Sequence, residues 1–281
     1  MSRAWKNRLF KAAMLFAMLV AFGTLAVLLV DIFVTGWPEI DRQLFSGPPS
    51  TVPEEAGARP AILATLYLGV LVLLLSVPIG ILTAIYLEEY ANRERWWNRL
   101  IEVNIQNLAA VPSIVYGILG LAFIVRGIGV GRAVLAGGLI LTLVVLPTVV
   151  VASREAIRAV PDSIRQGAYA LGATQWQVVS RQVLPAAIPG VATGVILSVS
   201  RAFGEAAPLL LIGALNFVTF NPQPFSDDGY SAMPVLIYNY ALRPQDEFKV
   251  LAAAGVVVML IIVVALNGFA IWLRNRYEQQ W

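Results

Sequence analysis

The sequence predicts an all-α integral membrane protein with six transmembrane helices. Of its 281 residues, 58% are hydrophobic and only 13% are charged. Soluble domains carry about a quarter charged residues, so this balance is typical of a chain embedded in lipid. Apolar runs of roughly 20 residues, the length that a helix needs to cross the hydrocarbon core, recur along the chain. Cysteine and histidine are both absent, which excludes disulfides, thiol chemistry and histidine-based catalysis and argues against zinc sites.

The first apolar run, residues 12–33, follows a basic segment as the core of a secretory signal peptide does. We interpret it as an uncleaved first transmembrane helix, because it is longer than such a core and lacks a small-x-small cleavage site before Asp31. Five further runs predict the remaining spans, at about residues 61–86, 100–125, 133–152, 186–215 and 250–273.

The third of these spans begins with two polar turns that contain Glu102, Asn104, Gln106 and Asn107. A segment with this start either lies in the membrane interface or lines an internal cavity. No internal repeat, low-complexity tract or soluble segment is evident in the sequence. We therefore expect residues 1–281 to form a single transmembrane domain, with one structured loop at residues 153–185.

Basic residues are distributed unequally between the two sides of this topology. Loops on the side that carries both termini contain thirteen Lys and Arg residues, whereas those on the other side contain six. Because cytoplasmic loops are enriched in Lys and Arg, both termini are predicted to be cytoplasmic. The thirteen are Arg3, Lys6, Arg8, Lys11, Arg93, Arg95, Arg99, Arg154, Arg158, Arg165, Arg181, Arg274 and Arg276, and the six are Arg42, Arg59, Arg126, Arg132, Arg243 and Lys249.

Arg201 and Glu205 are the only charged residues in the fifth predicted span. A charge near mid-membrane costs at least about 2.5 kcal/mol, so an unexplained one is a functional-site hypothesis. The two residues are four apart and share a helix face, where they either form an ion pair that fixes packing or present a guanidinium to an anion. Pro208 cannot donate to the Gly204 carbonyl, which predicts a kink beside the pair. Hydroxyls that could extend such a site, or serve as small packing residues, are those of Thr193, Ser198 and Ser200.

The loop at residues 153–185 predicts two short helices. The first is capped by Asp162 or Ser163 and stops at Gly172, which suits a left-handed position. The second starts with a capping box from Thr174 to Gln177. We expect Leu184-Pro185 to end it and apolar side chains to be exposed, either as an interfacial anchor centred on Trp176 or as a docking surface for a partner. These side chains are Tyr169, Leu171, Trp176, Val179 and Val183.

Gln166-Gly167-Ala168, Gly172 and Leu184-Pro185 resemble the EAA loop of permease subunits of bacterial ABC importers. The chain departs from that pattern where Gln166, Gly167 and Gln182 replace Glu, Ala and Ile. The longer strings GAYALGAT, from Gly167, and SRAFGEAAPLL, from Ser200, resemble the A-type permeases of the phosphate-specific importer.

The resemblance implies a type I importer permease fold, with the loop as coupling helices that contact an ATPase. The loop residues concerned are Gln166, Gly167, Ala168, Tyr169, Gly172, Thr174, Trp176, Leu184 and Pro185. It also implies that Arg201 contacts phosphate, that Glu205 orients Arg201 and limits the positive charge of the pathway, and that Ser198 and Ser200 line that pathway.

Partners and location follow from the same resemblance. They are a homologous second permease, two ATPase subunits, an extracytoplasmic phosphate-binding protein and the lipid of a bacterial inner membrane, with no nucleic acid. The sequence has no G-x-x-x-x-G-K-[ST] phosphate loop. We therefore expect ATP and Mg²⁺ on the partner ATPases, and no catalytic residues, cofactor or metal on this chain.

Three alternatives remain open. The chain could serve another oxyanion, such as sulfate or molybdate. A stand-alone secondary transporter or channel is less favoured, because such transporters usually contain inverted repeats and none is evident. An intramembrane enzyme is least favoured, because no nucleophile–base pair or metal constellation is present in the sequence.

Overall fold

The computed structural model describes residues 3–92, 94–212, 214, 218–223 and 228–277, and every regular element in these ranges is a helix. Five helices are long and apolar enough to cross a membrane. The fold class is therefore confirmed as an all-α membrane protein. Arg93 and Leu215, which the sequence placed in a basic loop and at the end of the fifth span, lie outside the described residues.

The long helices are α1 (Arg3–Gly36), α3 (Arg59–Ile85), α6 (Val134–Arg158), α9 (Leu184–Gly204) and α12 (Asp246–Tyr277). The shorter α-helices are α2 (Arg42–Ser46), α4 (Trp96–Ala110), α5 (Ser113–Gly120), α7 (Asp162–Ala170), α8 (Gln175–Val178), α10 (Ala207–Ile212) and α11 (Met233–Ala241). Three π-helical segments, η3 (Tyr86–Tyr90), η4 (Leu121–Ile128) and η5 (Val179–Val183), and two 3₁₀ turns, η1 (Trp37–Glu39) and η2 (Pro53–Glu55), complete the series.

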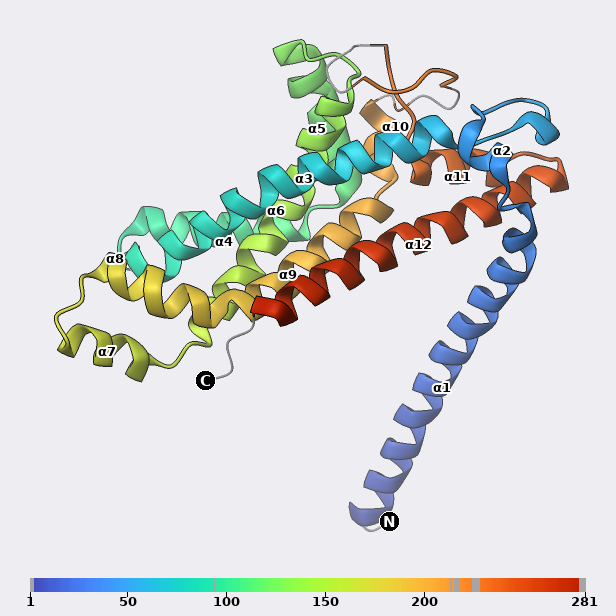
Figure 1. Ribbon diagram of the computed structural model, residues 1–281. Coiled ribbons are helices and arrows are strands. Elements are labelled where there is room, and N and C mark those ends of the chain that lie inside the picture. The colour runs from blue at the N-terminus through green and yellow to red at the C-terminus, as the bar shows by residue number, and fades with distance from the viewer. Residues whose placement is uncertain (1–2, 93, 213, 215–217, 224–227, 278–281) are drawn as a thin grey trace.

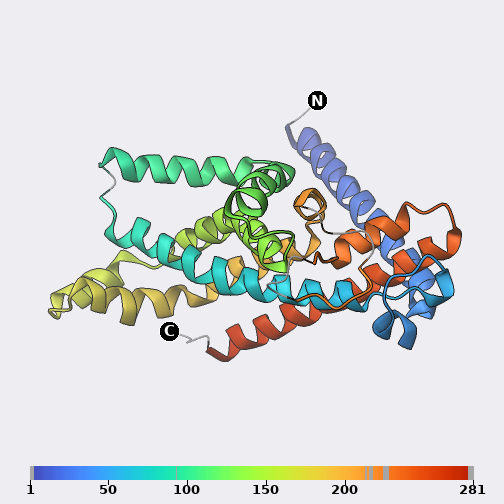
Figure 2. The ribbon, with the colours of Figure 1, turned by 90° about the horizontal axis from the view of Figure 1, so that it is seen from above.

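The centre of the molecule is a layer in which α6 packs between α3 and α9 (Figures 1 and 2). Small residues allow the close approach of α6 and α9: a Cβ atom added at Gly194 would lie 2.3 Å from Cβ of Ala152. This is the small-residue packing that membrane helices use, because lipid supplies no hydrophobic drive for their association. α12 packs along α9, and polar groups on each helix meet at Ser200 and Asn267.

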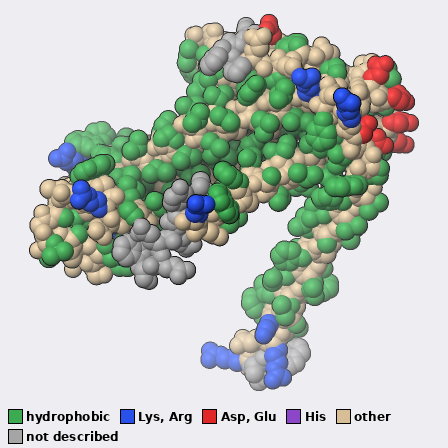
Figure 3. Space-filling view, in the orientation of Figure 1, with side chains coloured by type: hydrophobic (Ala, Val, Ile, Leu, Met, Phe, Trp, Pro, Cys, Tyr) green, Lys and Arg blue, Asp and Glu red, His purple; other side chains and the backbone are tan. Residues whose placement is uncertain are grey.

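α1 contacts the rest of the chain mainly at the start of α12 and otherwise stands away from the bundle (Figure 1). None of its apolar span is buried. Figure 3 shows hydrophobic side chains covering α1 and the bundle, while charged side chains gather at the ends of the molecule. This distribution is expected for helices surrounded by lipid or by another membrane subunit.

The third predicted span, residues 100–125, is not a straight helix. It is formed by α4 and by α5 with η4, and the two parts are bent by 103°. Val111 is extended, with φ −70° and ψ 129°, because the ring of Pro112 disfavours a helical conformation in the residue before it. The described part of the chain therefore has five helices that are long and apolar enough to cross a membrane, or six spans if this bent pair is counted as one.

The expectation that Leu184-Pro185 ends the second loop helix is wrong. α8, η5 and α9 form one continuous helix of 30 residues, Gln175–Gly204. Pro185 lacks the amide of a regular helix, and the π-helical segment η5 directly precedes it and accommodates the change in register. Val179 and Val183, predicted to be exposed, are fully buried against Ala84, Ile85 and Ile157.

The free ends of α1 and α12 point away from the end of the bundle that carries α2 and α11 (Figure 1). This agrees with an even number of crossings. The assignment of both ends to the cytoplasm stays a prediction. The opposite end of the bundle, which carries α7 and α8, is called the loop end.

Candidate functional site

Arg201 and Glu205 lie where the fifth span breaks. α9 ends at Gly204, and Glu205 is extended, with φ −81° and ψ 101°, before α10 begins at Ala207. Nε of Arg201 donates to Oε1 of Glu205 at 3.2 Å. The predicted interruption is present. It falls at Glu205, three residues before Pro208 and next to Gly204, whose carbonyl cannot accept a hydrogen bond from Pro208.

Arg201 faces away from the bundle. Its side chain is 58% exposed, whereas that of Glu205 is 16% exposed. Thr193, Leu197 and Gly204 are also exposed, and their spacing of four, four and three residues with Arg201 defines one face of α9. We call these four residues the exposed stripe. This stripe presents the Arg201 guanidinium on the surface of the helix, with its Nε bonded to the Glu205 carboxylate.

Ser198 and Ser200 do not join Arg201 on this stripe. Ser198 is buried and donates to the Gly194 carbonyl at 2.8 Å. The Ser200 hydroxyl lies 2.6 Å from Oδ1 of Asn267 on α12 and 2.7 Å from the Ile196 carbonyl. The structure thus places both hydroxyls in contacts within and between helices.

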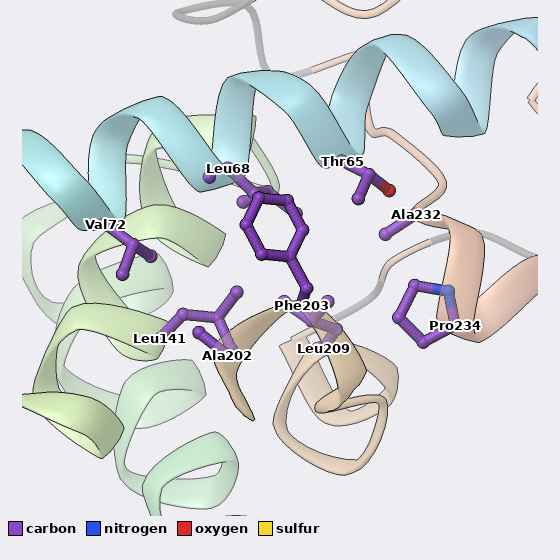
Figure 4. Close-up of a pocket in the computed structure, with 10 residues that line it drawn as sticks. Thr65, Leu68, Val72, Leu141, Ala202, Phe203, Leu209, Ala232 and Pro234 are labelled. Atoms are coloured by element: carbon purple, nitrogen blue, oxygen red, sulfur yellow. The ribbon is translucent and has the colours of Figure 1, made fainter. Parts of the chain in front are cut away.

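Phe203, which follows Arg201 by two residues, points the opposite way, into a small apolar pocket between α3, α6 and α10 (Figure 4). The ring lies over Gly69 of α3, where an added Cβ would be 2.2 Å from Cζ of Phe203. The one polar side chain among the lining residues is Thr65, and its hydroxyl already donates to Ala61 O and accepts from the Met233 amide. This pocket therefore offers nothing that would bind an anion.

The loop of residues 153–185 has the turn chemistry that the sequence predicts. Gly172 has φ +83°, which L side chains rarely adopt. Thr174 and Gln177 form a reciprocal capping box, in which the Thr174 amide donates to Oε1 of Gln177 at 2.8 Å. At the start of α7, however, the cap is Pro161, and neither Asp162 nor Ser163 caps the helix.

The apolar surface of the loop is smaller than predicted. Leu171 is 90% exposed and Trp176 is 65% exposed, with Tyr169 at 46%. Beside them, a concave surface between α7 and the start of the long helix contains Gly167, Ala168 and Gly172. Among the other predicted loop residues, Gln166 lies on α7, while Leu184 and Pro185 lie inside the continuous helix.

A buried group of charges lies behind the loop, and the sequence did not predict it as a site. Glu88 of η3 accepts from Nε of Arg154 and from Nη2 of Arg158, each at 2.8 Å. Nη2 of Arg154 also donates to Glu102 of α4 at 2.7 Å. The side chains of Glu88 and Arg154 are only 3% and 7% exposed, so these contacts connect α3, α4 and α6 in a region of low dielectric constant.

Glu89, the neighbour of Glu88, binds the loop itself. Its carboxylate accepts from Nη2 of Arg165 on α7 at 2.8 Å and from Nε at 3.2 Å. The side chains are 7% and 16% exposed. The sequence signal for this group is a pair of acidic residues at the end of an apolar run. Their arginine partners lie too far along the chain for the pairing to be predicted from spacing.

The family model described as "Binding-protein-dependent transport system inner membrane component" matches residues 76–279. The chain is 30% identical over 276 residues to "Phosphate transport system permease protein PstA 1" of Mycobacterium tuberculosis, covering 97% of this chain and 90% of that one. It is also 30% identical over 266 residues to "Probable ABC transporter permease protein YqgI" of Bacillus subtilis, covering 89% and 90%.

Solved structures of similar fold include a chain of a bacterial alginate ABC transporter in complex with its alginate-bound periplasmic protein. It has a TM-score of 0.66 and 17% identity, with 99% of both chains covered. A chain of the inward-facing MetNI methionine ABC transporter has a TM-score of 0.59 and 16% identity, covering 77% of this chain and 92% of that one. At these identities the likeness concerns the fold.

Proposed function

The chain belongs to the family of binding-protein-dependent transport system inner membrane components, and on this premise we propose that it is a permease subunit of an ATP-driven importer of inorganic phosphate. Members are multi-pass proteins of the bacterial inner membrane. The family consists of ABC transporter permeases, so the chain is a non-enzymatic transport subunit. Phosphate is favoured because relatives that cover most of the chain are named phosphate permeases.

The observation that carries the assignment to an oxyanion is the geometry of Arg201. Glu205 engages Nε, and among the residues that the structure describes no partner engages the two terminal nitrogens. These nitrogens are therefore available to donate to two oxygens of one oxyanion, which suits the planar fork of arginine. Glu205 fixes the direction of the fork and offsets its charge, so that a bound anion can also leave.

The exposed stripe of α9 is proposed to face the translocation pathway, opposite a second, homologous permease. Two ATPase subunits would bind at the loop end, where Leu171 and Trp176 provide an exposed apolar edge beside the Gly172 turn. An extracytoplasmic phosphate-binding protein would deliver the anion at the opposite end. ATP and Mg²⁺ are assigned to the ATPases.

The test uses the complete complex in liposomes and compares Arg201→Gln with Arg201→Lys. Hydrogen bonds to charged groups contribute about 1.5–3 kcal/mol, so Arg201→Gln is expected to lower uptake about 10- to 150-fold. Uptake by Arg201→Lys, which keeps the charge and loses the planar fork, should lie between that of the unmodified complex and that of Arg201→Gln. Assembly should survive, because an ion pair as exposed as this one contributes at most about 1 kcal/mol.

Ser200→Ala is the matched control, since this hydroxyl is already bonded to Asn267 on α12 and to the Ile196 carbonyl. If both Arg201 variants fail to assemble, the pair fixes packing and is not a transport site. Competing sulfate and molybdate test the choice of oxyanion. The phosphate assignment fails if phosphate neither enters nor stimulates ATP hydrolysis while one of the other oxyanions does.

A further inference from the structure

The two acidic residues of η3 attach the end of α3 to different parts of the molecule. Glu88 binds Arg154 and Arg158 of α6, whereas Glu89 binds Arg165 of α7. The side-chain amide of Gln175, the first residue of α8, donates to the backbone carbonyl of Glu89. Both short helices of the 153–185 loop are therefore bound to one turn of η3, which lies far from them in the sequence.

Arg165 is held rigidly in this contact. Besides its two hydrogen bonds to Glu89, its Nη1 donates to the Val160 carbonyl at 2.6 Å and its Nη2 to the Ile157 carbonyl at 2.9 Å. With the guanidinium bonded on each side and only 16% exposed, α7 has little freedom to move without displacing Glu89. A displacement of the loop by an ATPase would thus reach the end of α3 directly.

At its other contact, α3 touches the helix break that carries Arg201. α3 and η3 form one continuous helix, Arg59–Tyr90, and Gly69 lies roughly 30 Å along it from Glu89. Gly69 receives the ring of Phe203, which lies between Arg201 and Glu205 in the sequence (Figure 4). Thr65 and Val72, one turn to either side on the same face, bear side chains that would meet this ring if α3 slid along α9.

We propose that α3 is the lever that transmits movement of the 153–185 loop to the Arg201–Glu205 break. Glu89 and Arg165 are its positioning residues at the loop end, and the Gly69–Phe203 contact is its other point of action. This inference rests on the proposed function. Its physical basis is that the continuous helix of α3 and η3 is bonded to the loop through Glu89 at one end and packed on Phe203 further along, so a displacement at the loop reaches the break. Gly69 leaves room for the Phe203 ring, whereas Thr65 and Val72 would meet it, so a slide of α3 must displace Phe203, because packed interiors do not deform continuously.

The absence of cysteine from the chain allows a direct test. Leu197→Cys, on the exposed stripe and one turn from Arg201, reports the accessibility of the break through its rate of labelling by a maleimide. Labelling is measured on this subunit in the assembled complex, first without nucleotide and then in a state that holds ATP without hydrolysing it. When Leu197→Cys is the only substitution, we expect the bound ATP to change the labelling rate on the order of fivefold or more.

Glu89→Gln and Arg165→Gln should each reduce this nucleotide-dependent change toward one, and should lower phosphate uptake per ATP hydrolysed. Arg165→Lys, which keeps the positive charge and donors for Glu89 and the neighbouring carbonyls, should preserve most of both. Asp162→Asn is the matched control, because Asp162 also binds Arg165, at 3.2 Å, but is 85% exposed. Its response should equal that of the unmodified complex.

Gly69→Ala and Phe203→Leu test the other contact, far from any ATPase surface. Each should reduce the labelling response while the complex still assembles and hydrolyses ATP. If Glu89→Gln does not assemble, Arg165→Lys and these two variants decide. The proposal is overturned if assembled variants at either contact keep the full nucleotide response and the full uptake per ATP. Absence of phosphate uptake by the unmodified complex would instead defeat the proposed function.

Discussion

Arg154→Met tests the buried charges behind the loop, because Arg154 is bonded to both Glu88 and Glu102. Its loss leaves two carboxylates with different surroundings. Glu102 is 38% exposed and can be solvated, whereas Glu88 is 3% exposed and retains Arg158, which is itself 46% exposed. The penalty therefore falls mainly on Glu88.

Removing one partner of a buried ion pair costs about 3–5 kcal/mol when the remaining charge has no compensation. Since Glu88 keeps one of its two arginines, we expect roughly half of this, about 2 kcal/mol. For a chain of this size that corresponds to a fall of about 4–8 °C in melting temperature. The measurement is thermal unfolding of the purified subunit complex in lipid nanodiscs, followed by intrinsic fluorescence.

Two comparisons make the result decisive. Asp246→Asn breaks an exposed ion pair, whose Lys249 and Asp246 side chains are 55% and 87% exposed, and should leave the melting temperature nearly unchanged. Arg154→Met with Glu88→Leu removes both buried partners of this ion pair and should be more stable than Arg154→Met alone. The reasoning is refuted if Arg154→Met is as mild as Asp246→Asn, or if the double variant is the least stable of the three.

Three further predictions concern the loop and the α9–α12 contact. Gly172→Ala places a side chain at φ +83°, a backbone conformation that should cost about 1–2 kcal/mol, and the cost should be seen as weaker binding of the ATPase subunits. An added Cβ would meet nothing within 4 Å, so the cost comes from the backbone alone. Unchanged binding would show that the turn has relaxed. Thr174→Ala removes the capping box and should lower stability by about 1 kcal/mol in thermal unfolding, with Thr174→Ser as the control that keeps it. Ser200→Ala should cost about 0.6 kcal/mol, and at most about 1.7, without changing the phosphate concentration for half-maximal uptake; a changed value would return Ser200 to the pathway.

The parts of the fold that the sequence predicted depend on local patterns. Apolar runs located the spans, since their length and composition are set by the bilayer alone. Gly172 and the Thr174–Gln177 capping box were also predictable, because each satisfies backbone groups within a few residues. The break beside Arg201 followed from Pro208 for the same reason.

The errors arise where packing between distant segments decides the outcome. The size of the bend at Val111–Pro112, 103°, could not be predicted, because a proline within an apolar run is compatible with a kinked span or a broken one. Val179 and Val183 resemble an exposed helix edge until Ala84 and Ile157 are placed against them. Glu88 and Glu89 pair with arginines 66 to 76 residues further along, a separation that no local spacing rule addresses.

The continuous helix Gln175–Gly204 also bears on the depth of the proposed anion site. Its 30 residues span roughly 45 Å, whereas the hydrocarbon core of a bilayer is about 30 Å thick. A rod this long cannot be positioned by the bilayer alone, because it can slide or tilt and still cover the core with apolar residues. The depth of Arg201 below the outer surface is then set by whatever holds the other end of the rod, near Gln175. Depth is therefore a property of the assembled complex, and bilayer thickness becomes a variable through which lipid composition can tune transport.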